Sequence, residues 1–362
     1  MKFIESIFEK LRKHPKRVVF PEGDEPRILA AAAEFVRLNL GVAVLLGKRD
    51  KVEAAAKEVG ISFDKIHIID PEDGQDLPLF IRRLEALHRY KGIAEQDARK
   101  IVTNVNYYGA MMLQNGQVDG LVGGATSNSG SILRPLFQLI KPLAGVKSIS
   151  SCMVLQVPDD RHGDRGVFTF ADCGVIPNPN VEQLASIATE SARLFRQLTG
   201  EIPRVAMLSY STKGSAQTQD TEKIVAATAL AKQMLFDKLQ VGEVDGELQG
   251  DTALVKEIAE IKAPGSPVAG QANVLIFPDL NSGNIAVKLV HRLAGGEAYG
   301  QILLGLDKPA ADLSRGASVH EIVGVAAIVG MQAIEYRRLY PDQGALRYET
   351  GNVIPSPTPA AI

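Results

Sequence analysis

The chain has 362 residues, of which 45% are hydrophobic and 23% charged, so it has the composition of a globular protein and the length of two ordinary domains. Its 40 basic residues are interspersed among 42 acidic ones, which disfavours nucleic acid as a partner. Apolar stretches such as Val42–Gly47 and Val323–Met331 are far shorter than the ~20 residues of a membrane span, so we expect no membrane association.

The N-terminal segment, residues 1–11, interrupts its apolar residues with acids at helical spacing, and we expect a first helix there rather than a secretory signal. Only Cys152 and Cys173 are present, and there is no C-x-x-C or paired His/Cys spacing. We therefore expect neither disulfides nor a bound metal, and a reducing cytoplasm as the compartment.

Short β-branched runs alternate along the chain with longer helical patterns, among them Ile28–Leu40, Val181–Leu198 and Thr221–Met234. This alternation predicts an α/β fold with largely parallel sheets. The predicted strands are Arg17–Pro21, Val42–Leu46, Ile66–Ile69, Leu121–Gly123, Ser151–Val157, Val167–Ala171, Val205–Tyr210, Val274–Phe277 and Gln301–Leu304.

Two breaks in the pattern suggest domain boundaries. Pro142 and Gly145 interrupt a helical pattern, and a second break lies near Gly305–Pro309. If the closing helix, Ser318–Tyr340, returns to the first domain, the middle of the chain is an insertion. We thus predict a discontinuous α/β domain I of residues 1–147 plus 305–348, an inserted α/β domain II of residues 148–304, and a cleft between them. Residues 349–362 form a Pro-rich tail.

Several common enzyme signatures are absent from the sequence. No two glycines stand at G-x-G spacing, which disfavours a standard dinucleotide-binding dehydrogenase. No serine lies in a G-x-S-x-G elbow, the common signal of α/β-hydrolases. His320-Glu321 begins like a zinc-protease motif, but Gly324 stands where the second histidine belongs.

A first candidate site follows the predicted strand Leu121–Gly123. The loop reads Gly-Ala-Thr-Ser-Asn-Ser-Gly-Ser and leads into a helical pattern at Ile132–Ile140 with Arg134 in its first turn. Small hydroxyl residues, bare backbone amides and a cation at a helix N-terminus suit a phosphate oxyanion. The same loop is equally typical of a polar helix cap without a ligand.

A second candidate site is the turn Asp312–Ser318, which we place beyond the C-terminal end of the strand Ile302–Leu304. Arg315 there is suited to gripping a phosphate in bidentate fashion, and Ser314 to donating a hydrogen bond to a substrate oxygen. A surface turn without a ligand is the alternative. Ser318 and Glu321 have the S-x-x-E spacing of a capping box, although Glu321 beside Arg315 also suits a base that takes a proton from a thiol.

Long strings across nearly the whole chain resemble the phosphate acetyltransferase family. The agreement includes the Asp312–Gly316 turn and is not confined to one motif. The other strings are Phe20–Gly23, Asp119–Val122, Arg134-Pro135, Phe170–Cys173, Pro177–Pro179, Met207–Thr212, Asp245–Gln249 and Phe277–Asn284. The butyryl-transferring relatives look less similar around the Ser-Arg turn, so the acetyl-transferring branch is favoured.

The resemblance implies two α/β domains of the isocitrate/isopropylmalate dehydrogenase-like kind, a homodimer, and no bound metal or nicotinamide. It also implies reversible transfer of an acetyl group between acetyl phosphate and coenzyme A, by direct attack of the thiolate in a ternary complex. Coenzyme A is then a substrate rather than a tightly bound cofactor, and phosphate, acetyl phosphate and acetyl-CoA are the other ligands. By motif, Arg315 binds phosphate, Ser314 contacts the reacting group and Arg134 holds a second anionic element.

Three departures from the family pattern bear on the site. His88 stands where the family usually has an arginine, with Arg89 as a substitute next to it. Glu321 aligns with the family's aspartate, the proposed thiol base. The loop that the family often has as Gly-Ala-Val-His-Ser-Thr reads Gly124-Ala125-Thr126-Ser127-Asn128-Ser129 in this chain. These changes leave two alternatives open, a catalytically weakened sensor dimer and an enzyme for propionyl or butyryl groups.

Overall fold

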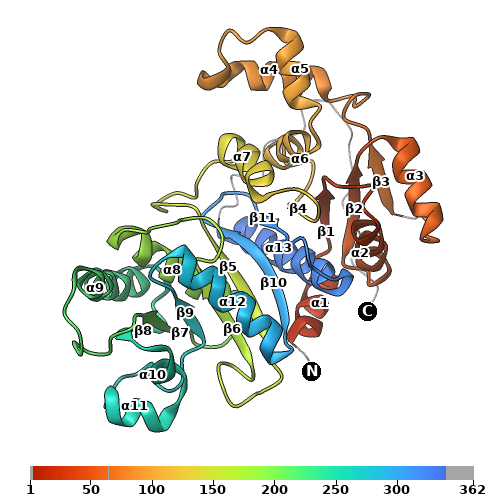
Figure 1. Cartoon of the computed structure of the whole chain (residues 1–362). Coiled ribbons are helices and arrows are strands. Elements are labelled where there is room, and N and C mark those ends of the chain that lie inside the picture. Colours follow the sequence, from red (N-terminus) through yellow and green to blue (C-terminus); the bar gives the residue numbers. More distant parts are fainter. Residues whose placement is uncertain (1–2, 64, 340–362) are drawn as a thin grey trace. The chain divides into compact units, whose positions relative to one another are not determined.

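The structure, a computed structural model, describes residues 3–63 and 65–339, with the side chains of His88 and of residues 337–339 left out. It falls into two compact units (Figure 1). Unit 2 is the continuous segment Pro142–Gly305, and unit 1 is formed by the chain before and after it. That the units are separate domains bordering a cleft, with boundaries at 147/148 and 304/305, stays a prediction. The Pro-rich tail, 349–362, lies outside the described residues.

Unit 1 is built on a parallel sheet in the order β3-β2-β1-β4-β11. Its strands are buried along almost their whole length, as expected of a parallel sheet that is covered on both faces. The bounds are β1 (Lys16–Phe20), β2 (Gly41–Leu46), β3 (Ile66–Ile69), β4 (Gly120–Gly123) and β11 (Ala310–Asp312).

The central helix of unit 1 is α13 (Val319–Leu339), which packs against α1 (Phe3–Lys13), α2 (Pro26–Arg37) and the strands β1 and β4. Val319–Tyr336 is long and apolar enough to span a membrane, but most of it is buried inside the unit, as in the core helix of a globular fold. The other helices are α3 (Arg49–Glu58), α4 (Leu77–Ala86), the 3₁₀ turn η1 (His88–Tyr90), α5 (Glu95–Val102), α6 (Val105–Gln114) and α7 (Ser129–Leu139).

Unit 2 has a mixed sheet in the order β10-β5-β6-β9-β7-β8, in which β5 runs antiparallel to both neighbours and the other pairs are parallel. The strands are β5 (Ser150–Gln156), β6 (Val167–Ala171), β7 (Arg204–Leu208), β8 (Glu243–Leu248), β9 (Val274–Ile276) and β10 (Glu297–Leu304). The helices are α8 (Val181–Thr199), α9 (Gln219–Leu239), α10 (Gly250–Leu254), α11 (Lys256–Lys262) and α12 (Leu280–Ala294).

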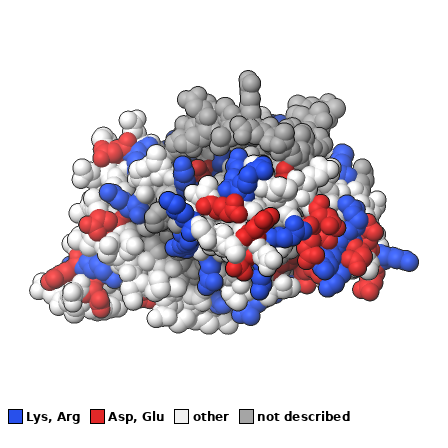
Figure 2. Space-filling model, turned by 90° about the horizontal axis from the view of Figure 1, so that it is seen from above, with Lys and Arg blue, Asp and Glu red and all other residues white. Residues whose placement is uncertain are grey.

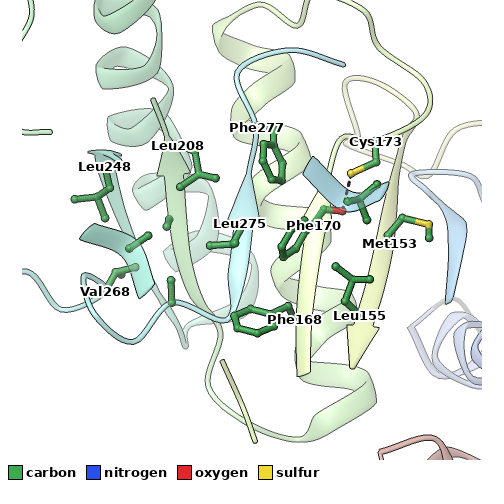
Figure 3. Close-up of a cluster of buried hydrophobic side chains, with 14 of the residues drawn as sticks. Met153, Leu155, Phe168, Phe170, Cys173, Leu208, Leu248, Val268, Leu275 and Phe277 are labelled. Atoms are coloured by element: carbon green, nitrogen blue, oxygen red, sulfur yellow. Dashed lines mark hydrogen bonds between the residues drawn. The ribbon is translucent and has the colours of Figure 1, made fainter. Parts of the chain in front are cut away.

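The core of unit 2 is a cluster of buried aromatic and aliphatic side chains on this sheet (Figure 3). Phe170 lies near its centre, with its ring centroid 5.4 Å from that of Phe277 and 6.1 Å from that of Phe168. Buried aromatic pairs of this kind add about 0.5–1.5 kcal/mol each beyond the area they bury.

The α/β fold with largely parallel sheets is confirmed in both units. Two strands, β8 and β11, were not predicted from the sequence, and β11 directly precedes the candidate turn Asp312–Ser318. The turn Asp312–Ser318 follows β11 of unit 1 directly, so its assignment to the end of the strand Ile302–Leu304 was wrong. On the face seen in Figure 2, acidic and basic side chains are interspersed, as the balanced composition predicts.

Candidate functional site

Three loops of unit 1 meet because their strands are parallel neighbours. β1, β4 and β11 lie side by side in the sheet, so the segments that follow them leave from the same edge. Those segments are 21–25, 124–128 and 313–318. The sheet therefore brings the two candidate sites of the sequence together with a third loop that the sequence reading left without a role.

The loop after β4 is wrapped around the carboxylate of Glu22. Glu22 Oε2 accepts the backbone N–H groups of Gly124 at 2.9 Å and Ala125 at 2.6 Å. Glu22 Oε1 accepts from Thr126 N at 2.9 Å, Thr126 Oγ1 at 2.8 Å and Ser127 N at 2.8 Å. Burial alone raises the pKa of Glu22, but the hydrogen bonds from Thr126 and Ser127 outweigh it and lower the pKa below its usual value.

This arrangement changes the expected use of the loop amides. The backbone N–H groups of residues 124–127 donate to the Glu22 carboxylate, so they are already engaged and do not form the phosphate-binding amides that the sequence suggested. Asn128 caps α7, with its side chain accepting from Ser131 N at 3.1 Å. What the loop offers a ligand is the exposed start of α7 at Asn128 and Ser129, where first-turn amides lack intrahelical acceptors.

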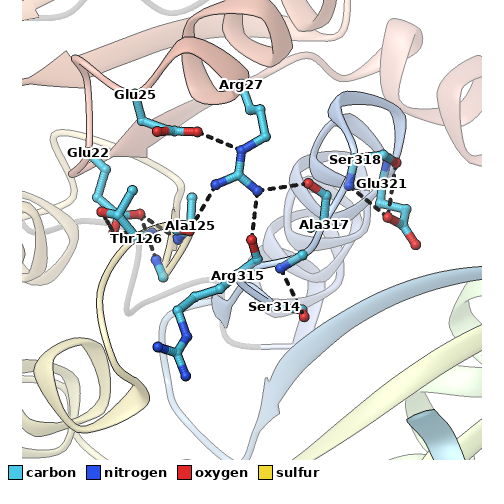
Figure 4. Close-up of polar contacts among 12 residues, drawn as sticks. Glu22, Glu25, Arg27, Ala125, Thr126, Ser314, Arg315, Ala317, Ser318 and Glu321 are labelled. Carbon is cyan, nitrogen blue, oxygen red and sulfur yellow. Dashed lines mark hydrogen bonds and ion pairs between the residues drawn. The ribbon is translucent and has the colours of Figure 1, made fainter. Parts of the chain in front are cut away.

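Arg27, at the start of α2, joins the loop after β4 to the turn after β11 (Figure 4). Its guanidinium donates to the carbonyl oxygens of Ala125 at 3.0 Å, Arg315 at 2.8 Å and Ala317 at 3.1 Å, and pairs with Glu25 at 2.6 Å. A planar group with five donors in a fixed fork suits three carbonyls from two loops. Neither Arg27 nor Glu22 was among the site residues predicted from the sequence.

Ser314 and Arg315 form an exposed turn whose backbone is held in place. The Arg315 carbonyl is fixed by Arg27, and Ala317 N donates to the Ser314 carbonyl at 2.9 Å. Figure 4 shows the Arg315 side chain extending away from Arg27. Its guanidinium has no acid or acceptor within the part of the chain that the structure describes, so the charge is available to an anionic ligand.

Glu321 is buried in the capping box that its spacing predicts. Its Oε2 accepts from Ser318 N at 2.8 Å and Ser318 Oγ at 2.9 Å, and Glu321 N donates to Ser318 Oγ at 3.2 Å. In Figure 4 its carboxylate lies on the Ser318 side of the turn, whereas the Arg315 side chain extends the other way. The capping-box interpretation therefore accounts for the contacts between Glu321 and Ser318.

Asp312, the last residue of β11, is a buried carboxylate that the sequence reading did not consider for chemistry. Its Oδ1 lacks a hydrogen-bond partner among the described residues. Gly124 lies directly against it, since a Cβ built on that glycine would fall 2.3 Å from Oδ1, and its φ of +103° also favours glycine. Burial raises the pKa of Asp312 to about 6; the Ser129 hydroxyl opposes this and the charge of Glu22 adds to it.

Arg134 and Arg89 line a surface pocket of about 520 Å³ together with Tyr90, Phe137 and Gln138. Arg134 also borders a second hollow of about 310 Å³, which reaches Asn128 and Ser131. Tyr107 donates to Gln138 Oε1 at 2.9 Å. Burial and the neighbouring Tyr90 raise the pKa of Tyr107 to about 12, with Arg134 and Arg89 acting against them. His88 opens η1, and its side chain lies outside what the structure describes.

The structure thus brings Ser314, Arg315, Glu321 and the loop 127–129 to one edge of the unit 1 sheet, and it places Arg134 and Arg89 at pockets on the same unit. Among the described residues, no group of three or more His, Cys, Asp or Glu is placed to hold a metal ion.

Comparisons with known proteins give one consistent result. The family described as "Phosphate acetyl/butaryl transferase" matches residues 2–330. A phosphate acetyltransferase of Thermoanaerobacterium thermosaccharolyticum is 47% identical and one of Acetivibrio thermocellus 43%, each over 92% of this chain and at least 98% of the relative. A crystal structure of a phosphotransacetylase from Streptococcus pyogenes is 36% identical, with a TM-score of 0.83 over 92% of this chain and 100% of that one.

Proposed function

Since the chain belongs to the phosphate acetyl/butyryl transferase family, we propose that it is a phosphate acetyltransferase. It transfers an acetyl group reversibly between acetyl phosphate and coenzyme A, by direct attack of the thiolate on the acyl carbon in a ternary complex. The observation that supports this best is the Arg315 guanidinium, which is exposed and unpaired among the described residues on a turn braced by Arg27.

Arg315 binds the phosphoryl group and stabilises the negative charge that develops on it as the acyl–oxygen bond breaks. Ser314 next to it donates a hydrogen bond to the reacting group. Ser127, Asn128 and Ser129 contact the phosphate end from the start of α7, which favours negative charge through its N-terminal dipole.

Coenzyme A has phosphate groups and an adenine ring, and it binds as a substrate. Arg134 and Arg89 supply cations to the pocket of about 520 Å³, and Tyr90 and Phe137 give it aromatic walls. Guanidinium groups for phosphates and aromatic surfaces for a base are the chemistry that a nucleotide needs. His88, close in sequence, belongs to the same proposed subsite.

The test is replacement of Arg315 by alanine. Among the described residues the Arg315 side chain makes no contact that holds the fold, so the variant should remain folded. It should lose about ten- to hundred-fold in turnover, the equivalent of a charge-assisted contact worth ~1.5–3 kcal/mol. Arg161→Ala is the matched control, because Arg161 is an exposed arginine of unit 2 that pairs with the neighbouring Asp159. Full activity of Arg315→Ala would contradict the assignment.

The same assay separates the two alternatives. Acetyl-CoA formation by the purified protein would eliminate the weakened sensor, and a panel of acetyl, propionyl and butyryl phosphates would reveal a different acyl preference.

Cys152 and Cys173 are buried free thiols, which fits the reducing cytoplasm that we propose as the compartment.

We also propose that the protein is a homodimer. Helix α12 carries Ile285, Leu289 and Leu293 at i, i+4 and i+8, with 57%, 53% and 82% of their surface exposed. Such a stripe on one helix face fits the self-complementary patch of a two-fold dimer. Leu289→Glu should shift the mass in solution from dimer to monomer, whereas Val225→Glu, an equally drastic change on α9, should not. A monomeric unmodified protein would refute the homodimer.

A further inference from the structure

The pocket proposed for coenzyme A contains a glutamine whose side-chain oxygen is held by two tyrosines. Gln138, near the C-terminal end of α7, lines the pocket of about 520 Å³ together with Tyr90. Its Oε1 accepts a hydrogen bond from the hydroxyl of Tyr107 at 2.9 Å and a second one from the hydroxyl of Tyr90. The amide oxygen of Gln138 is therefore used within the protein, by residues of α6 and η1.

The hydroxyl hydrogens of the two tyrosines decide which end of the amide faces them. Each phenol has one hydrogen to donate, and the hydroxyl oxygens of Tyr90 and Tyr107 lie 3.4 Å apart. If the amide were turned round, one hydroxyl could donate to the other, but the second would have no acceptor among the described residues. With Oε1 facing them, both hydrogens have an acceptor, so this orientation is favoured.

The NH₂ group of Gln138 is then left for a ligand in the pocket. It has no acceptor in the part of the chain that the structure describes, and the side chain is only half-buried. Gln114 shows the contrast, since its Nε2 donates to the Leu139 carbonyl at 2.8 Å and joins α6 to α7. Gln138 thus has its acceptor engaged and its donors free, and it suits a ligand atom that accepts a hydrogen bond.

The other walls of the pocket indicate which ligand atom this is. Tyr90 and the exposed ring of Phe137 are surfaces on which a base can stack, and Arg89 and Arg134 supply cations for phosphates. Adenine carries ring nitrogens that accept hydrogen bonds and an amine that donates them. An amide that reads adenine with both ends uses its oxygen for the amine, but the oxygen of Gln138 is occupied. The contact that remains is from N–H to a ring nitrogen.

We propose that the side-chain NH₂ group of Gln138 binds the adenine ring of coenzyme A by donating to a ring nitrogen, with Tyr90 and Tyr107 as positioning residues that hold the amide. This inference rests on the proposed acetyl transfer and names a residue that recognises its nucleotide substrate. Adenine takes no part in the transfer, so the contact is the same in the bound substrate and in the transition state. It should therefore affect the affinity for coenzyme A and leave kcat unchanged.

The test is the Kd of the full-length protein for coenzyme A, measured by titration calorimetry. Gln138→Glu keeps an acceptor for both tyrosine hydroxyls but replaces the NH₂ group with oxygen, and Gln138→Leu removes both ends of the amide. Each should raise the Kd at least about three-fold, the usual effect of one lost hydrogen bond. The value of kcat at saturating coenzyme A should stay within about two-fold of that of the unmodified protein.

Two further ligands show which part of coenzyme A is contacted. 4′-Phosphopantetheine lacks the adenine nucleotide, so the Kd for it should be the same in both variants as in the unmodified protein. Adenosine carries no phosphate and does not respond to the charge that Gln138→Glu adds. It should compete with coenzyme A for the unmodified protein and compete less well for both variants.

Two controls separate ligand binding from a structural role. Gln114→Leu removes an amide that the protein itself uses, and it should leave the Kd for coenzyme A unchanged. Tyr107→Phe frees the amide of Gln138 to turn, so it should weaken coenzyme A binding when Gln138 is present and have no effect in the Gln138→Leu background.

The proposal is overturned if both Gln138 variants bind coenzyme A as tightly as the unmodified protein, if they weaken 4′-phosphopantetheine equally, or if adenosine does not compete. Circular dichroism shows whether each variant is folded, and Gln138→Glu keeps the test decisive if Gln138→Leu is not. Failure of the proposed function has a different signature, namely no acetyl-CoA formation by the unmodified protein, which the calorimetric Kd values do not depend on.

Discussion

Glu22 is the residue on which the shape of the site depends most directly, and Glu22→Gln is its sharpest test. Glutamine keeps the size of the side chain but replaces one accepting oxygen with an NH₂ group. In the better of its two orientations, the amide oxygen faces Thr126 and Ser127. The NH₂ group then faces the N–H groups of Gly124 and Ala125, which are left without an acceptor.

The magnitude follows from those two amides. Each buried N–H that loses its acceptor costs about 1–3 kcal/mol, so the substitution should destabilise unit 1 by about 2–6 kcal/mol near neutral pH. The matched control is Glu53→Gln, which removes an exposed ion pair with Arg49 and should cost less than about 1 kcal/mol. The distorted loop should also lower acetyl transfer, because Ser129 and the start of α7 follow it.

Calorimetric unfolding of the two variants at pH 7.5 and at pH 3.5 checks both the size and the sign. The pKa of Glu22 is lowered in the folded protein, so the stability it contributes is present above its usual pKa of 4.5 and is lost as pH falls through the lower folded value. The difference between Glu22→Gln and the unmodified protein should therefore shrink at low pH. If Glu22→Gln unfolds at pH 7.5 within 1 °C of Glu53→Gln, the reasoning is refuted.

Three further outcomes are expected. Asp312→Asn should stabilise the protein by up to about 3 kcal/mol at pH 8. The pKa of Asp312 is raised from 3.8 to about 6 in the folded protein, so the unmodified protein loses stability as the pH rises through 6 and the carboxyl ionises. Calorimetry near pH 3 should show no gain for the variant. Arg27→Lys should lower kcat about ten-fold or more, since the three donors of an ammonium leave one nitrogen and cannot span the carbonyls of two loops as the guanidinium fork does. A normal kcat would mean that the two loops keep their positions without this bridge. Gly124→Ala should cost more than about 2 kcal/mol, whereas Gly60→Ala, at a positive φ with open space around it, should cost about 1 kcal/mol in urea unfolding.

The sequence predicted the fold well where hydrophobic patterning is strong. Strands such as Val42–Leu46 and Ile66–Ile69 are apolar runs bounded by helical patterns, and the structure has them as β2 and β3 with almost the same bounds. β11 was missed because it has three residues and reads Ala-Ala-Asp, with none of the β-branched residues that mark a strand. Its position is set by pairing with β4, which a local pattern does not contain.

The parts of the site that depend on local sequence were predicted, whereas the parts that depend on strand pairing were not. Ser314, Arg315 and the Glu321 capping box are local signals, and each lies in the kind of turn that was expected. Glu22 and Arg27 act on residues about 100 and 290 positions further along the chain. Glu22 lies in the string Phe20–Gly23 of the family resemblance, but only the strand order β1-β4-β11 reveals which loop it holds.

Two kinds of group meet at this edge of the sheet, and their difference explains how the site is built. Glu22 and Arg27 have their hydrogen-bonding capacity largely satisfied by backbone, so they stabilise the loops and have little capacity left for a ligand. Asp312 and Arg315 are the reverse, a buried carboxylate with an unsatisfied oxygen and a guanidinium without a partner in the described chain. Unsatisfied groups cost folding stability and persist when the surroundings hold them firmly. Substitutions of the first pair should therefore lower stability and activity together, whereas Asp312→Asn should raise stability at pH 8, because it removes a buried charge with an unsatisfied oxygen.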